Sequence, residues 1–209
     1  MGADASTPLK PRKTPTQNRS RVTVDAIFEA TIQVLLKGGM QGLTTTRVAE
    51  RAGVSVGTMY QYFPNKQALV YALNERYLDA LAARIEAICD AQSGAPLEQM
   101  IDALIDTYWT AKTERADVTR ALYRSVVELD NAAVVHHFAA RVDRATEAML
   151  ASASDAAFAD MKRTNLTLAA VIYGTVRNVF ERELSPQDAA LLRAELGQMC
   201  HTYATLSGR

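Results

Sequence analysis

Residues 44–69 read TTTRVAERAGVSVGTMYQYFPNKQAL, and this stretch decides the fold. Gly53 lies between two short segments of helical character, and it suits a tight turn because glycine tolerates a positive φ. Ala49 is small, as a close crossing of two helices requires. Apolar residues on both sides recur at spacings that would face one small shared core: Val48, Ala52, Val54, Met59 and Tyr62. The pattern predicts a helix-turn-helix, whose second helix enters the major groove of DNA.

The second short helix has a face that suits contact with DNA. Its exposed positions are expected to be Val56, Gly57, Thr58, Tyr60 and Gln61. Small side chains at the start of this helix let the backbone approach the groove, and the face has no acidic residue. The free N–H groups and the positive end of the helix dipole at the same terminus favour phosphate.

The segments around this motif also have helical periodicity. A first helix is expected from about Val24, and the later ones run from about Lys66 to Asp90, Leu97 to Lys112, Asp117 to Leu129, Ala132 to Ala153, Ala159 to Glu183 and Pro186 to Leu206. Breaks and caps are expected at Gly38–Gly39, Thr44 or Thr45, Ser55, Pro64, Asn65, Gly94, Pro96 and Ser185. No segment has the alternating pattern of a strand, so we expect an all-α fold.

The composition excludes several classes of protein. Of the 209 residues 48% are hydrophobic, which is enough for a packed core and excludes disorder along the whole chain. No stretch approaches the roughly 18 apolar residues of a membrane helix, so we expect no membrane partner. The N-terminal residues lack the apolar centre of a secretory signal. Cys89 and Cys200 form no CxxC pattern, and we expect reduced thiols in a cytoplasmic protein.

The net charge of zero conceals an uneven distribution. Residues 1–63 hold eight basic and four acidic residues, whereas residues 64–209 hold fifteen basic and nineteen acidic ones. Between Leu9 and Arg21 there are five basic residues and no acid. A basic N-terminal part suits a polyanionic partner at one end of the molecule. The alternative is a solvated tail without a partner, and charge alone leaves both open.

The motif resembles the DNA-binding part of the TetR family of bacterial transcriptional regulators. The resemblance is dense from about Val24 to Tyr71, whereas beyond about Leu81 it extends only to a helical domain of the right length. The matching residues are Thr45 or Thr46, Val48, Ala49, Ala52, Gly53, Val54, Ser55, Gly57, Thr58, Tyr60, Tyr62, Phe63, Lys66 and Leu69. Residues 1–21 are rich in Pro, Thr, Lys and Arg, so we expect a basic flexible arm there. The resemblance implies two parts after it: a three-helix DNA-binding head (22–70) and a helical domain for effector binding and dimerisation (71–209).

The resemblance also implies roles for individual residues of the head. Thr45 and Lys66 match phosphate contacts, and Tyr60 matches a tyrosine that packs on the DNA backbone. Thr46 and Arg47 reach phosphate or an adjacent base, and Gln61 reaches an adenine edge or a phosphate. The remaining expected contacts are Ser55, Val56, Gly57, Thr58 and Tyr62, with Phe63 in the core.

The chain departs from a strongly base-reading pattern at one place. Val56–Thr58 contains no Arg, Asn or Lys, so the methyl groups of Val56 and Thr58 would contact thymine methyls there. The polar readout would then fall to Gln61 or Arg47. Arg19 and Arg21 of the arm would enter a minor groove, or else belong to a solvated tail.

Members of this family bind palindromic operators as homodimers and are released by small-molecule effectors, and we expect the same partners here. One head has a small footprint, and a second copy doubles the phosphate contacts. The expected interface lies on the last two helices, with some of its residues in the core: Leu168, Val171, Ile172, Thr175, Val179, Leu191, Leu192, Ala194, Glu195, Met199 and Tyr203. The expected effector pocket is mostly apolar: Met100, Leu104, Tyr108, Trp109, Tyr123, Val127, Phe138, Met149, Met161, Leu168, Tyr173 and Arg177. Each of these residues also fits plain core packing.

An enzymatic reading has little support in the sequence. We find no nucleophile–base set, Gly-rich phosphate loop or metal-ligand spacing, so no catalytic residue, metal or cofactor is expected. His136 and His137 are helix neighbours that face different sides, and the same holds for Cys200 and His201. Asp102 and Asp106 share one face of a helix. Together they could form an acidic ligand shell, but a solvated face is the simpler interpretation. A helical interaction module without DNA binding stays open as an alternative.

Overall fold

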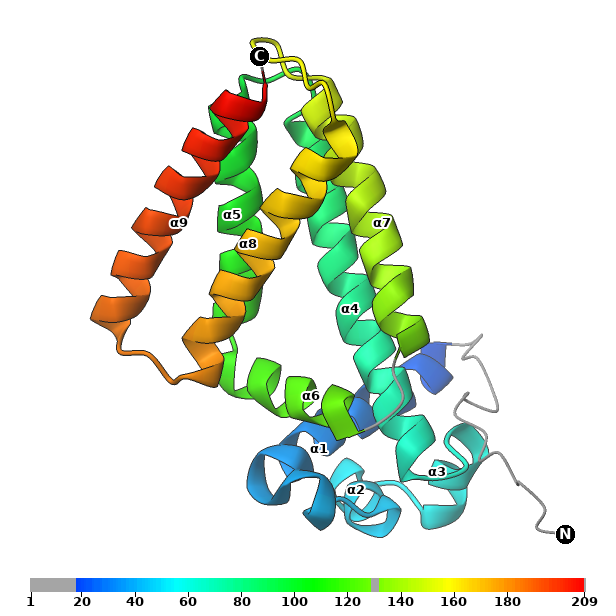
Figure 1. The fold of residues 1–209 in the computed structure, drawn as a ribbon. Helices are drawn as coiled ribbons and strands as arrows, with labels where there is room; N and C mark the ends of the chain where they lie inside the picture. Colours follow the sequence, from blue (N-terminus) through cyan, green and yellow to red (C-terminus); the bar gives the residue numbers. More distant parts are fainter. Residues whose placement is uncertain (1–17, 129–131, 209) are drawn as a thin grey trace, which may run out of the picture. The chain divides into compact units, whose positions relative to one another are not determined.

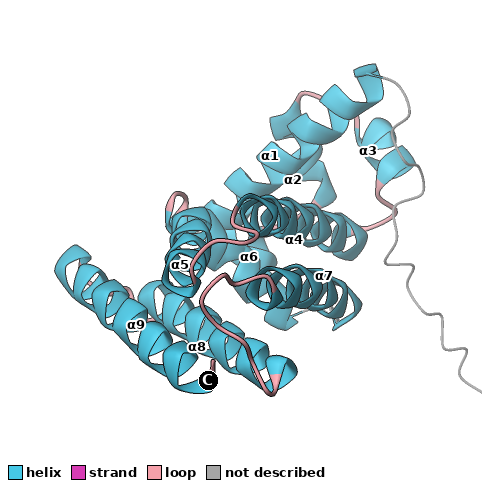
Figure 2. Cartoon of the chain, turned by 90° about the horizontal axis from the view of Figure 1, so that it is seen from above, coloured by secondary structure: helices cyan, strands magenta, loops and turns pink. Residues whose placement is uncertain are grey.

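The computed structural model describes residues 18–128 and 132–208, with side chains from Ser20 to Ser125 and from Ala132 onward. Within these residues the structure contains helices and loops only, which confirms the all-α prediction (Figures 1 and 2). The helices are α1 (Asn18–Gly42), α2 (Thr45–Ala52), α3 (Val56–Tyr62), α4 (Lys66–Ala91), α5 (Leu97–Thr113), α6 (Ala116–Glu128), α7 (Ala132–Ala151), α8 (Met161–Glu181) and α9 (Pro186–Ser207). None of these helices has an apolar stretch long enough to cross a lipid bilayer.

The predicted bounds of the long helices from α4 to α9 agree with the observed ones to within two residues, except that the predicted end of α6 at Leu129 lies outside the described residues. The reason is local chemistry at the helix ends. Asn65 Oδ1 accepts the backbone N–H of Ala68 at 2.8 Å, and Ser185 Oγ accepts that of Asp188 at 3.1 Å. Such side-chain caps satisfy N–H groups that have no partner within the helix.

The first helix differs from the prediction at both ends. It begins at Asn18, so residues 18–21 of the expected flexible arm are helical, while residues 1–17 lie outside the described chain. The apolar pattern from which the helix start is predicted begins at Val24, which is 7% exposed, whereas Val22 is 67% exposed. The expected stop at Gly38–Gly39 is a kink, because Gly39 takes φ 58° and the helix resumes as far as Gly42.

The chain forms two compact units. The head unit contains residues 18–77, 117–128 and 132, and the body unit contains residues 78–116 and 133–208. The boundary between the two compact units therefore lies inside α4, and α6 belongs to the head unit. The expected functional boundary after residue 70 stays a prediction.

The head unit is built around one core from α1, α2, α3, the first half of α4 and α6. Ile27, Leu43, Val48, Met59 and Leu69 are fully buried there. Polar contacts join α4 to α6. Asn74 Nδ2 donates to Ser125 Oγ at 3.2 Å, and the hydroxyls of Tyr77 and Thr119 lie 2.8 Å apart. One buried and one partly buried hydrogen bond thus set the position of α6 along α4 within this unit.

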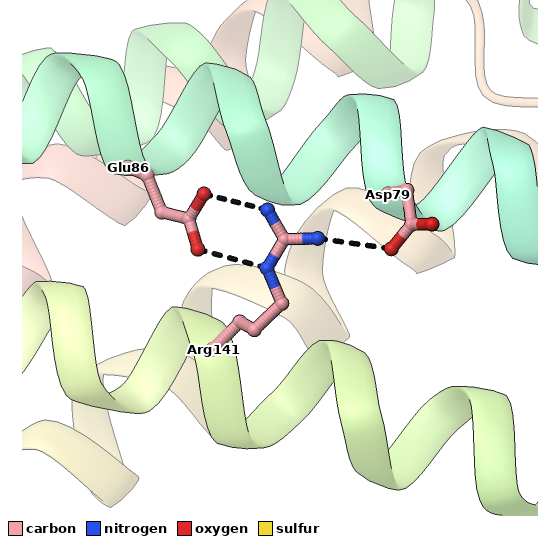
Figure 3. Close-up of polar contacts among 3 residues, drawn as sticks. All are labelled: Asp79, Glu86 and Arg141. Atoms are coloured by element: carbon pink, nitrogen blue, oxygen red, sulfur yellow. Dashed lines mark hydrogen bonds and ion pairs between the residues drawn. The ribbon is translucent and has the colours of Figure 1, made fainter.

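In the body unit α8 and α9 run side by side, and both pack on α5 (Figure 2). A polar clamp joins α4 to α7, since the Arg141 guanidinium donates to Glu86 at 2.6 and 2.9 Å and to Asp79 at 2.9 Å (Figure 3). These hydrogen bonds lower the pKa of the Glu86 carboxyl. Glu86 and Asp79 are seven residues apart, so they share one face of α4 and position one guanidinium between them.

A second polar contact of the body unit is buried. The Thr146 hydroxyl on α7 lies 2.6 Å from Asn165 Oδ1 on α8 and 2.9 Å from the carbonyl oxygen of Val142. Thr146 is 2% exposed and Asn165 is 3% exposed. Buried polar groups need partners, so this contact specifies how α7 meets α8.

We predict that Thr146→Val lowers the free energy of unfolding by about 1–3 kcal/mol, because Asn165 would keep a buried amide without this partner. Urea unfolding followed by circular dichroism measures the difference. Thr202→Val is the control, since its hydroxyl also bonds the carbonyl four residues earlier (2.8 Å) but lies on the surface. That change is expected to stay within about 0.5 kcal/mol. Coincident curves for Thr146→Val and wild type would contradict the prediction.

Candidate nucleic-acid interface

The turn between α2 and α3 is built as the sequence predicts. Thr44 caps α2, its Oγ1 accepting the backbone N–H of Arg47 at 3.2 Å. Gly53 ends α2 in the left-handed conformation (φ 67°, ψ 29°), and the Val54 N–H returns to the Ala49 carbonyl oxygen at 3.0 Å. A left-handed residue followed by this backward hydrogen bond is the common glycine stop of a helix. The chain turns there, and α3 starts after only three residues, Gly53–Ser55.

The start of α3 is fixed by its own cap. Ser55 Oγ accepts the backbone N–H of Thr58 at 3.0 Å and lies 2.8 Å from the Thr58 hydroxyl. This arrangement confirms Ser55 as the cap and draws the Thr58 side chain toward the helix end, where it is half-buried. The Ser55 hydroxyl therefore has a structural role in addition to the expected contact with DNA.

Buried and surface contacts hold α3 and the residue after it against α2 and α1. Val48 and Met59 are fully buried, and the Phe63 ring, 2% exposed, packs on Phe28 with centroids 5.6 Å apart. This confirms Phe63 as a core residue. At the surface, Thr45 Oγ1 and Tyr60 Oη lie 3.2 Å apart across the two helices. The contact brings together two predicted DNA contacts that are fifteen residues apart in the chain.

The face of α3 expected to meet DNA is exposed. Val56 is 39% and Tyr60 44% exposed, and Gly57 and Gln61 are also at the surface. Thr58 is half-buried, as described above, and Tyr62 is half-buried with its ring 6.4 Å from that of Phe63. Tyr62 therefore packs on the head core more than the other expected contacts of α3 do.

The cationic contacts are oriented by backbone carbonyl groups. Arg47, which is exposed like Thr46, donates from Nη1 to the Gly42 carbonyl oxygen at 2.9 Å. The Lys66 ammonium group lies 3.5 Å from the Met40 carbonyl oxygen. Both acceptors come from the end of α1 beyond the Gly39 kink, so this terminal turn supports the two cations. Sequence patterns did not reveal that support, because the contacts depend on how α1 ends in space.

The twelve effector candidates fall in different places. Tyr123 and Val127 are on α6 of the head unit, and the Val127 side chain lies outside the described residues, whereas the other ten belong to the body unit. Tyr108 and Tyr173 stack with centroids 4.4 Å apart, and Phe138 lies 6.4 Å from Tyr173. Arg177 is exposed and pairs with Glu181 at 2.7 Å. The buried members are Met100, Leu104, Tyr108, Trp109, Met149 and Leu168, and Met161 is half-buried.

The dimer candidates divide by exposure within the body unit. Ile172 is 1% and Leu168 2% exposed, and both are corrected to core, because a side chain buried inside its own subunit has no surface left for a partner. Leu191 is 63% and Met199 48% exposed, and Glu195 and Ala194 are at the surface. Those that are half-buried are Val171, Thr175, Val179, Leu192 and Tyr203.

The acidic face of α5 is paired with α9. Asp102 Oδ1 lies 2.9 Å from His201 Nε2, and Asp106 pairs with Arg193 at 2.5 Å. The two carboxylates are nevertheless 57% and 59% exposed, so they lie on a solvated face and contact α9 from it. Within residues 18–128 and 132–208 no three His, Cys, Asp or Glu side chains gather as metal ligands would. Cys89 and Cys200 are buried, and burial raises the pKa of each thiol to about 11.

Two family models match the chain. Residues 27–73 match the model described as "Bacterial regulatory proteins, tetR family". Residues 96–203 match the one described as "Tetracyclin repressor-like, C-terminal domain". The second match alone covers just over half of the 209 residues.

Individual relatives agree with these matches. The chain is similar to the HTH-type transcriptional repressor KstR of Mycobacterium tuberculosis, with 34% identity over 110 residues, which are 51% of this chain and 48% of that protein. It is 44% identical over 54 residues to the tetracycline repressor protein class C of Escherichia coli, which is 26% of this chain and 25% of that protein. The chain thus spans about half the length, or less, of these curated relatives.

The fold is similar to that of a solved structure, the fatty acid degradation regulator FadR from Bacillus halodurans. The TM-score is 0.69 at 18% identity, over 94% of this chain and 100% of that one. At this level of identity the comparison establishes a common fold alone.

We predict that Gly53→Val lowers the free energy of unfolding by roughly 1–3 kcal/mol, because a β-branched residue is strained at positive φ. Thermal unfolding measures the loss. Gly57→Ala is the matched control, since Gly57 is helical and an added Cβ would stay in ordinary contact, 3.7 Å from Ser55 Oγ. That variant is expected to be as stable as wild type, or more stable by up to about 1 kcal/mol. An unshifted melting temperature for Gly53→Val would count against the strain.

Proposed function

Since the chain belongs to the tetR family of bacterial regulatory proteins, we propose that it is a dimeric DNA-binding regulator of transcription. It acts as a repressor at a palindromic operator, and a small-molecule effector releases it. Its place of action is the bacterial cytoplasm, where the chromosome is accessible. The observation that carries the proposal is the exposed, acid-free face of α3 together with Thr45 of α2.

The contacts of the motif explain how this face would bind a duplex. The Thr45–Tyr60 contact fixes a hydroxyl pair at the edge of the motif, at a distance of 3.2 Å. Hydroxyl groups donate well to phosphate oxygens and hold a protein in register on the duplex. Arg47 and Lys66 add charge, and Gln61 is the polar side chain on the exposed face of α3 that reaches a base edge.

The body unit supports dimerisation through α8 and α9. Leu166, Leu191 and Leu206 are each more than 60% exposed, and Met199 is 48% exposed. Large apolar side chains concentrated on two neighbouring helices favour burial against a second copy. A symmetric pair holds two heads at one separation, which a palindrome requires.

The effector would act by changing the distance between the two heads of the dimer. A ligand that binds more tightly to the arrangement unable to bind DNA shifts the population toward it. The rings of Tyr108, Phe138 and Tyr173 supply an aromatic cluster for such a ligand. Aromatic faces stack on planar or cationic groups.

Binding to the protein's own promoter fragment across a salt series tests the proposal. A regulator that contacts phosphates loses affinity linearly on a log–log scale as salt rises, by about 0.9 in slope for each phosphate contact. We expect a steep slope and binding by a dimer. Absence of salt-dependent binding to any DNA would overturn the proposal in favour of a helical interaction module or an enzyme.

We predict that Lys66→Ala weakens binding to all DNA sequences about equally and flattens the salt slope by about one unit for each subunit. The ammonium group is a point charge for phosphate and does not read bases. Lys162→Ala, an exposed lysine of the body unit, is the control and leaves the slope unchanged. A slope for Lys66→Ala equal to that of wild type would refute the phosphate contact.

We predict that Tyr60→Ala weakens DNA binding about tenfold or more, because a hydrogen bond to a charged group contributes roughly 1.5–3 kcal/mol. Tyr60 is 44% exposed, so the melting temperature should barely change. Tyr60→Phe keeps the ring and removes the hydroxyl next to Thr45, which separates packing on the backbone from hydrogen bonding. Electrophoretic mobility shift assays measure both. A Tyr60→Ala protein with wild-type affinity would exclude this residue from the interface.

A further inference from the structure

A cleft of about 450 Å³ lies in the head unit between α1 and α2, beside the residues expected to bind DNA. We call it the α1–α2 cleft, and the residues used below are Lys37, Gly38 and Gly42 of α1 with Arg47, Glu50 and Arg51 of α2. Its lining has three cationic side chains and one carboxylate, a formal charge of +2. The two glycines leave the backbone open to close approach. A small concave surface of this charge complements a single anionic group.

The two guanidinium groups of the cleft are oriented by neutral oxygens. Arg47 donates to the Gly42 carbonyl oxygen at 2.9 Å, and Arg51 donates from Nε to the side-chain oxygen of Gln33. These acceptors carry no charge, so the contacts orient the side chains without cancelling their positive charge. A guanidinium has five N–H donors, and one such bond leaves others for a ligand. The Arg47 and Arg51 guanidinium groups are therefore already oriented in the cleft before a ligand binds.

The cleft is on the side of α2 away from α3. Thr45 faces α3, as its contact with Tyr60 at 3.2 Å indicates. Arg47 follows two positions later, roughly 200° around the helix axis, and Arg51 lies one turn further on the same face. In a helix-turn-helix the second helix lies in the major groove while the first crosses the sugar–phosphate backbone. The side of α2 opposite α3 therefore meets backbone and no base edges.

We propose that the α1–α2 cleft binds a backbone phosphate of duplex DNA beyond the groove that α3 enters. Lys37 and Arg51 are its phosphate ligands, and Arg47 is shared between the cleft and the motif. Glu50 limits the affinity, because a carboxylate in the same cleft repels the phosphate. The inference rests on the proposed DNA binding and extends it outward along the duplex.

Nested duplexes test this inference with the full-length protein. The wild-type protein first selects a binding sequence from a random library of DNA duplexes. A series of duplexes is then made around that sequence, each one base pair longer at both ends than the one before. Affinity is measured against length and salt for wild type, Lys37→Gln, Arg51→Gln and Glu50→Gln. Arg84→Gln is the control, since it removes one positive charge from the body unit, where Arg84 pairs with Glu114 at 3.1 Å.

The wild-type protein is expected to gain affinity in a step when the duplex becomes long enough to place a phosphate in the cleft. Lys37→Gln and Arg51→Gln should lose that step and match wild type on shorter duplexes. On long duplexes each flattens the salt slope by about 0.9 for each subunit. Glu50→Gln should enlarge the step, and Arg84→Gln should follow the wild-type curve.

Two results would overturn the inference while leaving the proposed function intact. One is that Lys37→Gln and Arg51→Gln still gain affinity in a step as the duplex lengthens, or lose affinity by the same factor at every duplex length. The other is that Glu50→Gln weakens binding. If the wild-type protein recovers no duplex from the library, the proposed function itself fails. Melting temperatures of all variants, whose changes are at exposed positions, confirm that each binding measurement is made on folded protein.

Discussion

The left-handed turn at Gly53 is the constraint on which the candidate interface depends. With φ at 67° at Gly53, the chain passes from α2 to α3 through three residues, Gly53–Ser55. Only that short path lets Val48 and Met59 share one buried core while Thr45 and Tyr60 meet at the surface. A β-branched residue would be strained at this φ, although an added Cβ would meet no neighbour within 4 Å.

The cations beside the candidate interface are held differently from the arginines that join helices elsewhere. In the head, Arg47, Arg51 and Lys66 bond to neutral amide and carbonyl oxygens, which orient the cations and keep their charge available. In the body, Arg141 and Arg193 pair with carboxylates between helices. The same residue type is thus available to the expected anionic partner at the candidate interface and joins helices elsewhere, including Arg76 of α4 with Asp25 of α1 inside the head unit. A net charge of zero conceals this division.

The end of α1 has a larger part in the candidate site than its sequence indicates. After the kink at Gly39, its last turn supplies the carbonyl groups that hold Lys66 and Arg47. A glycine pair predicts an interruption of a helix, and an interruption did occur. Whether the chain then leaves or resumes the helix depends on packing against α2, which no local pattern contains.

The sequence by itself determined the helical class, the long-helix ends and the helix-turn-helix, because caps such as Ser55 and stops such as Gly53 act over three or four residues. The tertiary structure alone decided which apolar residues are core: Ile172 and Leu191 have similar chemistry, yet one is 1% and the other 63% exposed. It also brought Lys37 beside Arg51. Helical periodicity specifies a face but not its neighbour, and the neighbour is set by the packing of helices distant in the chain.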